Sequence, residues 1–457
     1  MTDRDYLKSL GARALSEAND LKRTPEALAS ELAYNIDTVR SVIAGEAPVA
    51  TVRQLLEDMS RIYPVSFNNL WIEQNDTDQG ARIMRGTDSN RTSRIFDRPN
   101  RDGLESAYYD YRDTAMSRMA PFKPEWIQPL RTVSDADPYN PEVAFNKGHL
   151  MHQMTFFVGA VNFYWELDGE KHCVKMNTGD SNYITPFVPH SFTSRDPNNL
   201  GLIIAVTFAG RVRMALDEFS RIDGETAEEI SGDLRDPISA FEASLRRHMA
   251  AESLTVEQLV GEMASEGFTA QRANDIGRGN SLPTAEEIEV LARILAINPS
   301  SLQVRPLTKE QEVVICPAEL SMSRQYPNNN QPAYRLKHLA RTPHQPQLRG
   351  FQVIVLDDLE MQDSEMRHGL HEYVYNYGSE PVTLKWQQDR VDFLEPGDSV
   401  YLSPMVRHAF GRVQGCKEGQ LLIVRVPGGL SEEAITEFAA FVPAARSRVT
   451  RETTKWF

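Results

Sequence analysis

Two short stretches of the chain carry side chains that could bind one metal ion. His149, His152 and Gln153 lie within five consecutive positions, and His190 follows further along the chain. If both stretches are strands of one small barrel, these side chains can reach a common point. Imidazole ligands suit iron, zinc, copper or nickel, and an oxygen ligand beside them favours a site with open positions. We therefore hypothesise a mononuclear Fe(II) site that activates dioxygen.

A second set of similar residues occurs near the end of the chain. His368, His371, Glu372 and His408 repeat the pattern of the first set, with Glu372 in the position of Gln153. Two histidines and one carboxylate form the facial triad of Fe(II) oxygenases, whereas a neutral amide oxygen is a weaker ligand. The ligand types alone do not decide which set binds a metal. One set could be a relic whose histidines are merely packed or exposed.

Both sets belong to an internal repeat. The pattern Thr-x-Glu-x-Leu that starts at Thr24 recurs from Thr255, and Gly-Asp-Ser from Gly179 recurs from Gly397. Each threonine stands where a helix N-cap would, ahead of apolar residues spaced by one helical turn. The segments around the histidines are rich in β-branched and aromatic residues and are interrupted by turn signals, which is typical of a sandwich or jelly roll.

These patterns predict an α+β fold with two tandem copies of a helix-turn-helix bundle followed by a β-barrel of the jelly-roll type. The predicted segments are a helix-turn-helix domain, a connector with barrel lead-in, a metal-binding barrel, a second helix-turn-helix domain and a second barrel without catalytic metal. In chain order their boundaries are 1–75, 76–135, 136–247, 248–305 and 306–457.

Composition limits the classes of partner. The chain has 457 residues and a formal net charge of −15. Binding to nucleic-acid phosphates needs a basic face, and the expected recognition segments 35–44 and 269–279 carry few cations. A transcription regulator with barrel sensor domains is the alternative from another class. The three cysteines lack paired spacing, and no apolar run is long enough to span a membrane, so we expect a cytoplasmic protein.

Residues suited to an anion accompany only the first set. Arg101, Tyr109 and Asn146 precede His149 and offer one guanidinium with two neutral donors, the combination that a phosphonate or phosphate needs. Beside the second set stands Arg407, next to His408, but a strand residue adjacent to one that faces inward usually points outward. The first barrel is therefore expected to carry the chemistry.

The glycine and histidine patterns of both β segments resemble the two motifs of the cupin family. More specifically, the Asn-x-Gly-His-Leu pattern from Asn146, the Arg101–Tyr109 segment and the Pro-His-Ser pattern around His190 resemble the hydroxyethylphosphonate dioxygenase family of non-haem iron cupin enzymes. The domain order is similar as well. This resemblance implies that the first cupin binds Fe(II) through His149 and His190.

The third ligand implied by the resemblance depends on the branch of this family. In the dioxygenase it is a glutamate six residues before the second histidine, a position that Ile184 occupies here. In the methylphosphonate synthase branch it is a glutamine four residues after the first histidine, and Gln153 stands there. Positions 149 and 153 share one face of a strand, whereas His152 would face away or contribute from an irregular strand.

The resemblance also implies a reaction. Fe(II) and O2 would convert 2-hydroxyethylphosphonate to methylphosphonate and CO2; the alternative products are hydroxymethylphosphonate and formate. Arg101, Tyr109, Asn146 and Asn182 are the predicted substrate-binding residues. Lys22 is predicted to act catalytically, from its own subunit or from a neighbouring subunit of a homo-oligomer.

Overall fold

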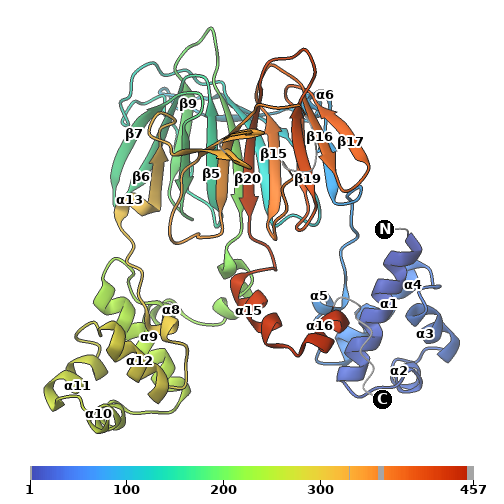
Figure 1. Ribbon diagram of the computed structural model, residues 1–457, viewed down its shortest axis with the longest axis vertical. Helices are drawn as coiled ribbons and strands as arrows, with labels where there is room; N and C mark the ends of the chain where they lie inside the picture. Colours follow the sequence, from blue (N-terminus) through green and yellow to red (C-terminus); the bar gives the residue numbers. More distant parts are fainter. Residues whose placement is uncertain (1–2, 329, 359–364, 450–457) are drawn as a thin grey trace. The chain divides into compact units, whose positions relative to one another are not determined.

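The computed structural model describes residues 3–328, 330–358 and 365–449. The chain divides into two compact units, which we call the terminal unit and the central unit. The terminal unit comprises Met1–Ser89, Thr114–Pro121 and Val355–Phe457, and the central unit comprises Asn90–Asp113 and Phe122–Ile354. Both units contain helices and antiparallel strands (Figure 1), in agreement with the predicted α+β class.

The first helices of the terminal unit pack around their own apolar core. They are α1 (Asp3–Asp20), α2 (Pro25–Glu31), α3 (Ile36–Ile43), α4 (Val49–Ile62) and α5 (Phe67–Leu70). Thr24 caps α2 by accepting a hydrogen bond from the backbone N–H of Ala27, which confirms the predicted N-cap. Leu10, Leu28 and Leu55 are fully buried in the core. The remaining helices of this unit are α6 (Gly86–Asn90), α15 (Glu432–Ala440) and α16 (Pro443–Val449).

The strands of the terminal unit belong to two sheets. Antiparallel pairing gives the neighbour order β1 (Ala81–Met84), β18 (Ser399–Leu402), β15 (His371–Asn376) and β20 (Gly419–Val426). A three-stranded sheet has the order β17 (Arg390–Leu394), β16 (Val382–Trp386) and β19 (His408–Arg412). Each of the two sheets contributes a strand that starts at one of the predicted histidines.

The strands of the central unit follow the same plan. The larger sheet has the order β11 (Val313–Cys316), β8 (Ser181–Ile184), β5 (His152–Val158), β10 (Leu202–Phe208), β4 (Phe122–Pro129), β3 (Glu105–Asp113) and β2 (Arg94–Pro99). The smaller sheet has the order β7 (Glu170–Met176), β6 (Val161–Leu167) and β9 (His190–Ser194). Phe157, Phe163 and Ile203 lie in the buried core of the central unit. Further strands are β12 (Ser323–Tyr326), β13 (Tyr334–His338) and β14 (Arg349–Val355).

The helices of the central unit lie between β10 and β11 in the chain. They are η1 (Arg211–Arg213), α7 (Leu216–Phe219), α8 (Gly224–Ser231), α9 (Pro237–Ala251), α10 (Val256–Ser265), α11 (Ala270–Gly277), α12 (Ala285–Ile294), η2 (Pro299–Leu302) and α13 (Lys309–Glu312). Thr255 caps α10 in a capping box with Gln258, so the second predicted N-cap is also confirmed. Leu259 and Leu291 are buried in the core of this helical group.

Two strands pair in an order that differs from their order in the chain. β1 precedes the strands of the central unit in the sequence, yet it pairs with β18 of the terminal unit. Conversely, β11 precedes the late strands of the terminal unit and pairs with β8 of the central unit. In the central unit, β11 lies beside β8, which pairs with β5, the strand of Gln153. In the terminal unit, β1 lies beside β18, which pairs with β15, the strand of Glu372.

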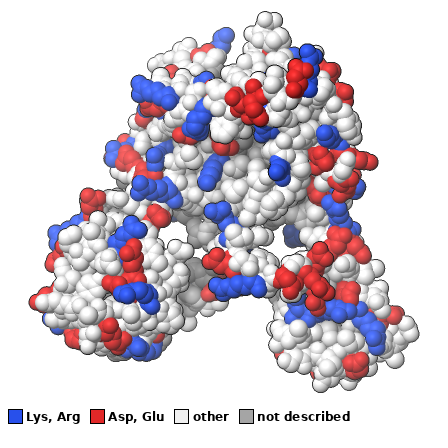
Figure 2. Space-filling model, turned by 180° about the vertical axis from the view of Figure 1, so that it is seen from behind, with Lys and Arg blue, Asp and Glu red and all other residues white. Residues whose placement is uncertain are grey.

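The helices that could have contacted DNA hold their cations in ion pairs. Arg40 of α3 lies 3.0 Å from Glu26, and Arg272 of α11 lies 2.6 Å from Glu287. Figure 2 shows acidic and basic side chains interspersed on the face that it presents. Phosphates would have to displace these carboxylates, which opposes DNA binding. Among the described residues, no helix is long and apolar enough to cross a membrane.

Candidate metal centres

The central unit brings His149, Gln153 and His190 together. His149 stands just before β5, Gln153 is the second residue of β5, and His190 begins β9. Nε2 of His149 lies 3.3 Å from Oε1 of Gln153, and the two imidazole ring centres are 5.3 Å apart. Gln153 and His190 are each only 4% exposed. The cluster therefore offers two ring nitrogens and one amide oxygen to a common, buried point.

Backbone carbonyls orient both histidines of this central cluster. Nδ1 of His149 lies 3.0 Å from the carbonyl oxygen of Met151, and Nδ1 of His190 lies 2.9 Å from that of Val188. A neutral imidazole that donates from Nδ1 carries its lone pair on Nε2, the atom that faces the cluster. Burial lowers the pKa of His190 to about 4. The side chain is therefore neutral at physiological pH, as a metal ligand must be.

Gln153 is oriented by its neighbour on the same strand. Its Nε2 donates a hydrogen bond of 2.9 Å to Oγ1 of Thr155, which leaves Oε1 directed at His149. In the antiparallel pairing of β5 with β8, Gln153 lies directly opposite Ile184. Residues that pair in this way project from the same face of a sheet. The third ligand could thus come from either strand at this point, and only Gln153 has an oxygen to offer.

His152 points away from the cluster. Its Nδ1 lies 2.7 Å from the hydroxyl of Tyr183, and its ring stacks on Phe208 at a centroid distance of 5.2 Å. Burial lowers the pKa of His152 to about 4, which keeps the ring neutral. This arrangement is that of a packed neighbour of the candidate metal ligands.

Asn146 and Tyr109 lie next to the ligands. Oδ1 of Asn146 accepts a hydrogen bond of 2.9 Å from the backbone N–H of His190, and its Nδ2 lies 3.0 Å from Nε2 of that histidine. The hydroxyl of Tyr109 lies 3.3 Å from Oγ of Ser191 and accepts a hydrogen bond of 2.9 Å from the N–H of Phe192. The amide and the phenol therefore both contact residues at the start of β9.

Asn182 is also directed inward. It lies on β8 opposite Thr155, so it shares a face with the residues that orient Gln153. The residue is fully buried, and neither its Oδ1 nor its Nδ2 has a hydrogen-bond partner among the described residues. A buried amide without partners is costly, and a polar ligand or water in the interior would satisfy it.

Arg98, which the sequence analysis did not single out, lies near the cluster. Its guanidinium carbon lies 5.2 Å from the ring centre of Tyr108 and 5.1 Å from that of Tyr109. The charge of Arg98 also contributes to the low pKa of His190, after burial. Arg101, by contrast, has a side chain that is 66% exposed and lies 3.5 Å from Glu142. The alternation of side chains along a strand could have pointed to Arg98. Arg98 belongs to β2, whereas Arg101 lies after the end of this strand.

Tyr108 and Ser191 were missed as well. The hydroxyl of Tyr108 lies 2.8 Å from Oγ of Ser191 and accepts a hydrogen bond from the backbone N–H of Ala144. Ser191 follows His190 directly and contacts Tyr108 and Tyr109 of β3. Lys22 belongs to the terminal unit, on the turn after α1, and its Nζ lies 3.5 Å from the carbonyl oxygen of Asn19. Its role at the metal stays a prediction.

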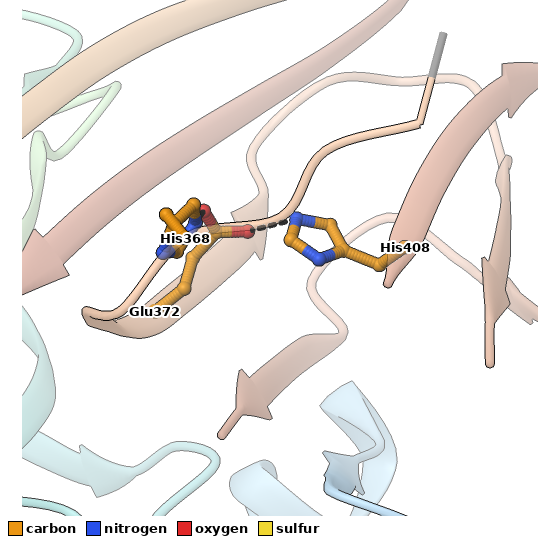
Figure 3. Close-up of side chains that lie close together, drawn as sticks. All are labelled: His368, Glu372 and His408. Atoms are coloured by element: carbon orange, nitrogen blue, oxygen red, sulfur yellow. Dashed lines mark hydrogen bonds and ion pairs between the residues drawn. The ribbon is translucent and has the colours of Figure 1, made fainter. Parts of the chain in front are cut away.

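The terminal unit contains a second cluster, His368, Glu372 and His408 (Figure 3). Nε2 of His368 lies 2.9 Å from Oε2 of Glu372, and Nε2 of His408 lies 3.0 Å from Oε1. Arg425 of β20 lies 2.5 Å from Oε2. Burial alone would raise the pKa of Glu372, but the charge of Arg425 holds this pKa well below its usual value. One ligand atom from each member of the cluster lies within 4.8 Å of the others.

Comparison with known proteins places the chain in a family. No family model matches it. The chain is 34% identical over 458 residues to methylphosphonate synthase of Nitrosopumilus maritimus, which covers 99% of this chain and 96% of that protein. The chain belongs to the methylphosphonate synthase family. The predicted resemblance is thereby confirmed.

Two solved structures resemble this chain over nearly its whole length. The enzyme HEPD of Streptomyces albus, with 2-hydroxyethylphosphonate and Fe(II) bound, is 33% identical, with a TM-score of 0.88 and complete coverage of both chains. Another hydroxyethylphosphonate dioxygenase is 19% identical, with a TM-score of 0.73 over 97% of this chain and 99% of that one. The second likeness supports the fold alone.

Proposed function

We propose that the protein uses Fe(II) and O2 to convert 2-hydroxyethylphosphonate to methylphosphonate and CO2 by cleaving the carbon–carbon bond. The observation that carries the proposal is the donor set of the central cluster: His149, Gln153 and His190, with Ile184 opposite Gln153. Full-length similarity to a methylphosphonate synthase supports the same reaction. The substrate supplies all four electrons that O2 takes up, and water is the further product, so no external reductant is required.

The residues of the central unit divide the work between metal and substrate. His149, Gln153 and His190 would hold Fe(II), which supplies the activation of dioxygen when bound. Both histidines direct Nδ1 at a backbone carbonyl, which leaves Nε2 available to a metal, and Oε1 of Gln153 lies 3.3 Å from Nε2 of His149. Burial keeps His190 neutral and excludes bulk water from its ring.

The phosphonate would lie on the side of the cluster bordered by β2, β3 and the start of β9. There the guanidinium of Arg98, the hydroxyls of Tyr108 and Tyr109 and the amide of Asn146 provide one charge and several neutral donors. Charge-assisted hydrogen bonds of this kind fix the orientation of an anionic group. Orientation is what these side chains contribute to the rate. Asn182 adds an inward amide, and Arg101 and Lys22 remain predicted contributors.

We also propose that the chain consists of two copies of a helix-turn-helix bundle and a cupin barrel, within the predicted boundaries. The matching strand registers of the two units support this, since Gln153 pairs with Ile184 of β8 as Glu372 pairs with Leu402 of β18. The enzyme would be a homo-oligomer of the cytoplasm. Its three cysteines are free thiols, which suits a reducing compartment.

Phosphorus NMR of a single incubation tests the reaction. Protein loaded with Fe(II) is mixed with 2-hydroxyethylphosphonate and O2, and we expect methylphosphonate as the phosphorus product. Hydroxymethylphosphonate as the sole product, with formate, would show that the protein is a dioxygenase of the same family. Protein treated with chelator and a sample kept free of O2 are the controls, and both should leave the substrate unchanged.

A further inference from the structure

The second cluster contains two buried polar atoms that face each other at close range. Nδ1 of His408 lies 3.0 Å from the carbonyl oxygen of Val406, so the neutral ring carries its lone pair on Nε2. This Nε2 lies 3.0 Å from Oε1 of Glu372. Both atoms are buried, and neither has a hydrogen-bond partner among the described residues. Two lone pairs at this distance repel unless a proton or a metal ion binds to both atoms.

His368 completes the same arrangement. Its Nδ1 lies 3.1 Å from the carbonyl oxygen of Leu370, which again directs the lone pair of Nε2 towards Glu372. The two imidazole rings are 5.7 Å apart at an angle of 81°. In the central cluster the corresponding rings are 5.3 Å apart at 87°. The terminal unit therefore presents nitrogen atoms in nearly the same geometry as the central unit.

Arg425 does not close the second cluster, because it contacts Oε2 of Glu372, and Oε1 has no hydrogen-bond partner among the described residues. Its Nε lies 2.5 Å from Oε2 of Glu372, and its Nη2 contacts Sδ of Met366. Oε1 remains directed at His408 (Figure 3). The carboxylate and the guanidinium together carry no net charge. Electrostatically, this pair equals the neutral Gln153, whose second atom is likewise occupied, by Thr155.

We infer that His368, Glu372 and His408 bind a second divalent ion of the first transition row, such as zinc or iron. Glu372 ligates through Oε1, while Arg425 holds Oε2 and fixes the orientation of the carboxylate, as second-shell partners of metal ligands do. The ion is structural. Where Asn146 stands three residues before His149, Glu365 stands three residues before His368, and its carboxylate, 3.5 Å from Arg407, disfavours an anionic substrate.

Metal content measured on the full chain tests this assignment. Chelator-treated protein is saturated with Zn(II), separated from free ion by gel filtration and analysed by mass spectrometry for zinc per chain. We expect two ions in the wild type, one in His149→Ala, one in His408→Ala and none in the double variant. One ion in the wild type together with unchanged content in His408→Ala would overturn the inference.

A melting experiment covers the case in which a variant folds poorly. In the His149→Ala protein only the terminal site remains, and an ion that binds the folded state alone raises Tm with its concentration. We expect Zn(II) to raise Tm of this variant, and the added substitution Glu372→Gln to remove the rise. A Tm that does not respond to Zn(II), or that responds equally with Glu372→Gln, contradicts the second site. The catalytic reaction is independent of both outcomes.

Discussion

The central and terminal clusters share their ligand spacing and differ in what surrounds it. In both, a backbone carbonyl orients each histidine, and the third ligand stands four residues after the first. Gln153 is held by the hydroxyl of Thr155, whereas Glu372 is held by the guanidinium of Arg425. Spacing along a strand therefore fixes where the ligands point, while residues on neighbouring strands fix the charge and the access of the site.

Strand pairing places different residues opposite the third candidate ligand in the two clusters. Gln153 pairs with Thr207 of β10, and Glu372 pairs with Arg425 of β20, so threonine and arginine occupy matching positions. Thr207 donates its hydroxyl hydrogen to the carbonyl oxygen of Lys123. Arg98 and the adjacent tyrosines, which we propose to bind the phosphonate, come from β2 and β3 of the central unit.

Removal of the third candidate ligand should give the largest difference in turnover between the two clusters. We expect Gln153→Ala to lower turnover by on the order of 1,000-fold, because loss of a direct ligand exceeds the 10–100-fold cost of losing a second-shell partner. Glu372→Ala should lower turnover far less. Initial rates and iron content of both variants measure this. A larger loss in Glu372→Ala would move the catalytic site to the terminal unit.

A rescue experiment sharpens the role of the Gln153 position. Because Ile184 lies directly opposite, a glutamate placed there should reach the same point from the neighbouring strand. We expect the double variant Gln153→Ala with Ile184→Glu to regain iron that Gln153→Ala alone loses. Iron content after saturation measures this, and Ile184→Gln is the matched control for charge. No recovery in either double variant would show that the two positions do not share a ligand point.

Loss of Arg425 should affect stability more than loss of its counterpart Thr207. Removing one partner of a buried ion pair leaves the other charge uncompensated, so Arg425→Met should lower the free energy of unfolding by about 3 kcal/mol in the presence of chelator. Thr207→Val removes one neutral hydrogen bond and should cost about 1 kcal/mol. Urea denaturation measures both. Equal costs would mean that Glu372 is not held as an isolated buried charge in the metal-free protein.

Arg98 and Arg101 should contribute differently to substrate binding at the central cluster. Arg98→Gln removes a guanidinium beside Tyr108 and Tyr109, and loss of a charge-assisted hydrogen bond of about 1.5–3 kcal/mol corresponds to a 10–100-fold rise in KM. Arg101→Gln should change KM by less than about threefold, since its exposed side chain is screened by water. Steady-state kinetics with 2-hydroxyethylphosphonate decide. A stronger effect of Arg101→Gln would support Arg101 as the substrate-binding arginine.

The smallest expected effect is a loss of stability that should be equal in the two units. His152 and His371 each place Nδ1 2.7 Å from a tyrosine hydroxyl, that of Tyr183 and Tyr401 respectively. Tyr183→Phe and Tyr401→Phe should each lower the free energy of unfolding by about 1 kcal/mol, because a buried ring nitrogen loses its partner. Urea denaturation of the two variants tests the equivalence. A difference of more than about 1 kcal/mol would break it.

Local patterns predicted the helix starts and the ligand spacing. The N-caps at Thr24 and Thr255 follow from residue type and the apolar turn after each, which are properties of adjacent residues. The approach of His149 to Gln153 follows from the common face of positions four apart at a strand start. Arg98 was missed because motif spacing favoured Arg101, whereas only the pairing of β2 with β3 shows which arginine meets the tyrosines.

The sequence by itself determined the ligand types, their spacing and the family, because each depends on residues close together in the chain. Only the tertiary structure decided that Ile184 lies opposite Gln153, that Arg425 holds Glu372, and that β1 and β11 pair outside their chain order. Strand pairing joins residues far apart in sequence, and its register follows from burial of whole strand faces. No short motif contains that information.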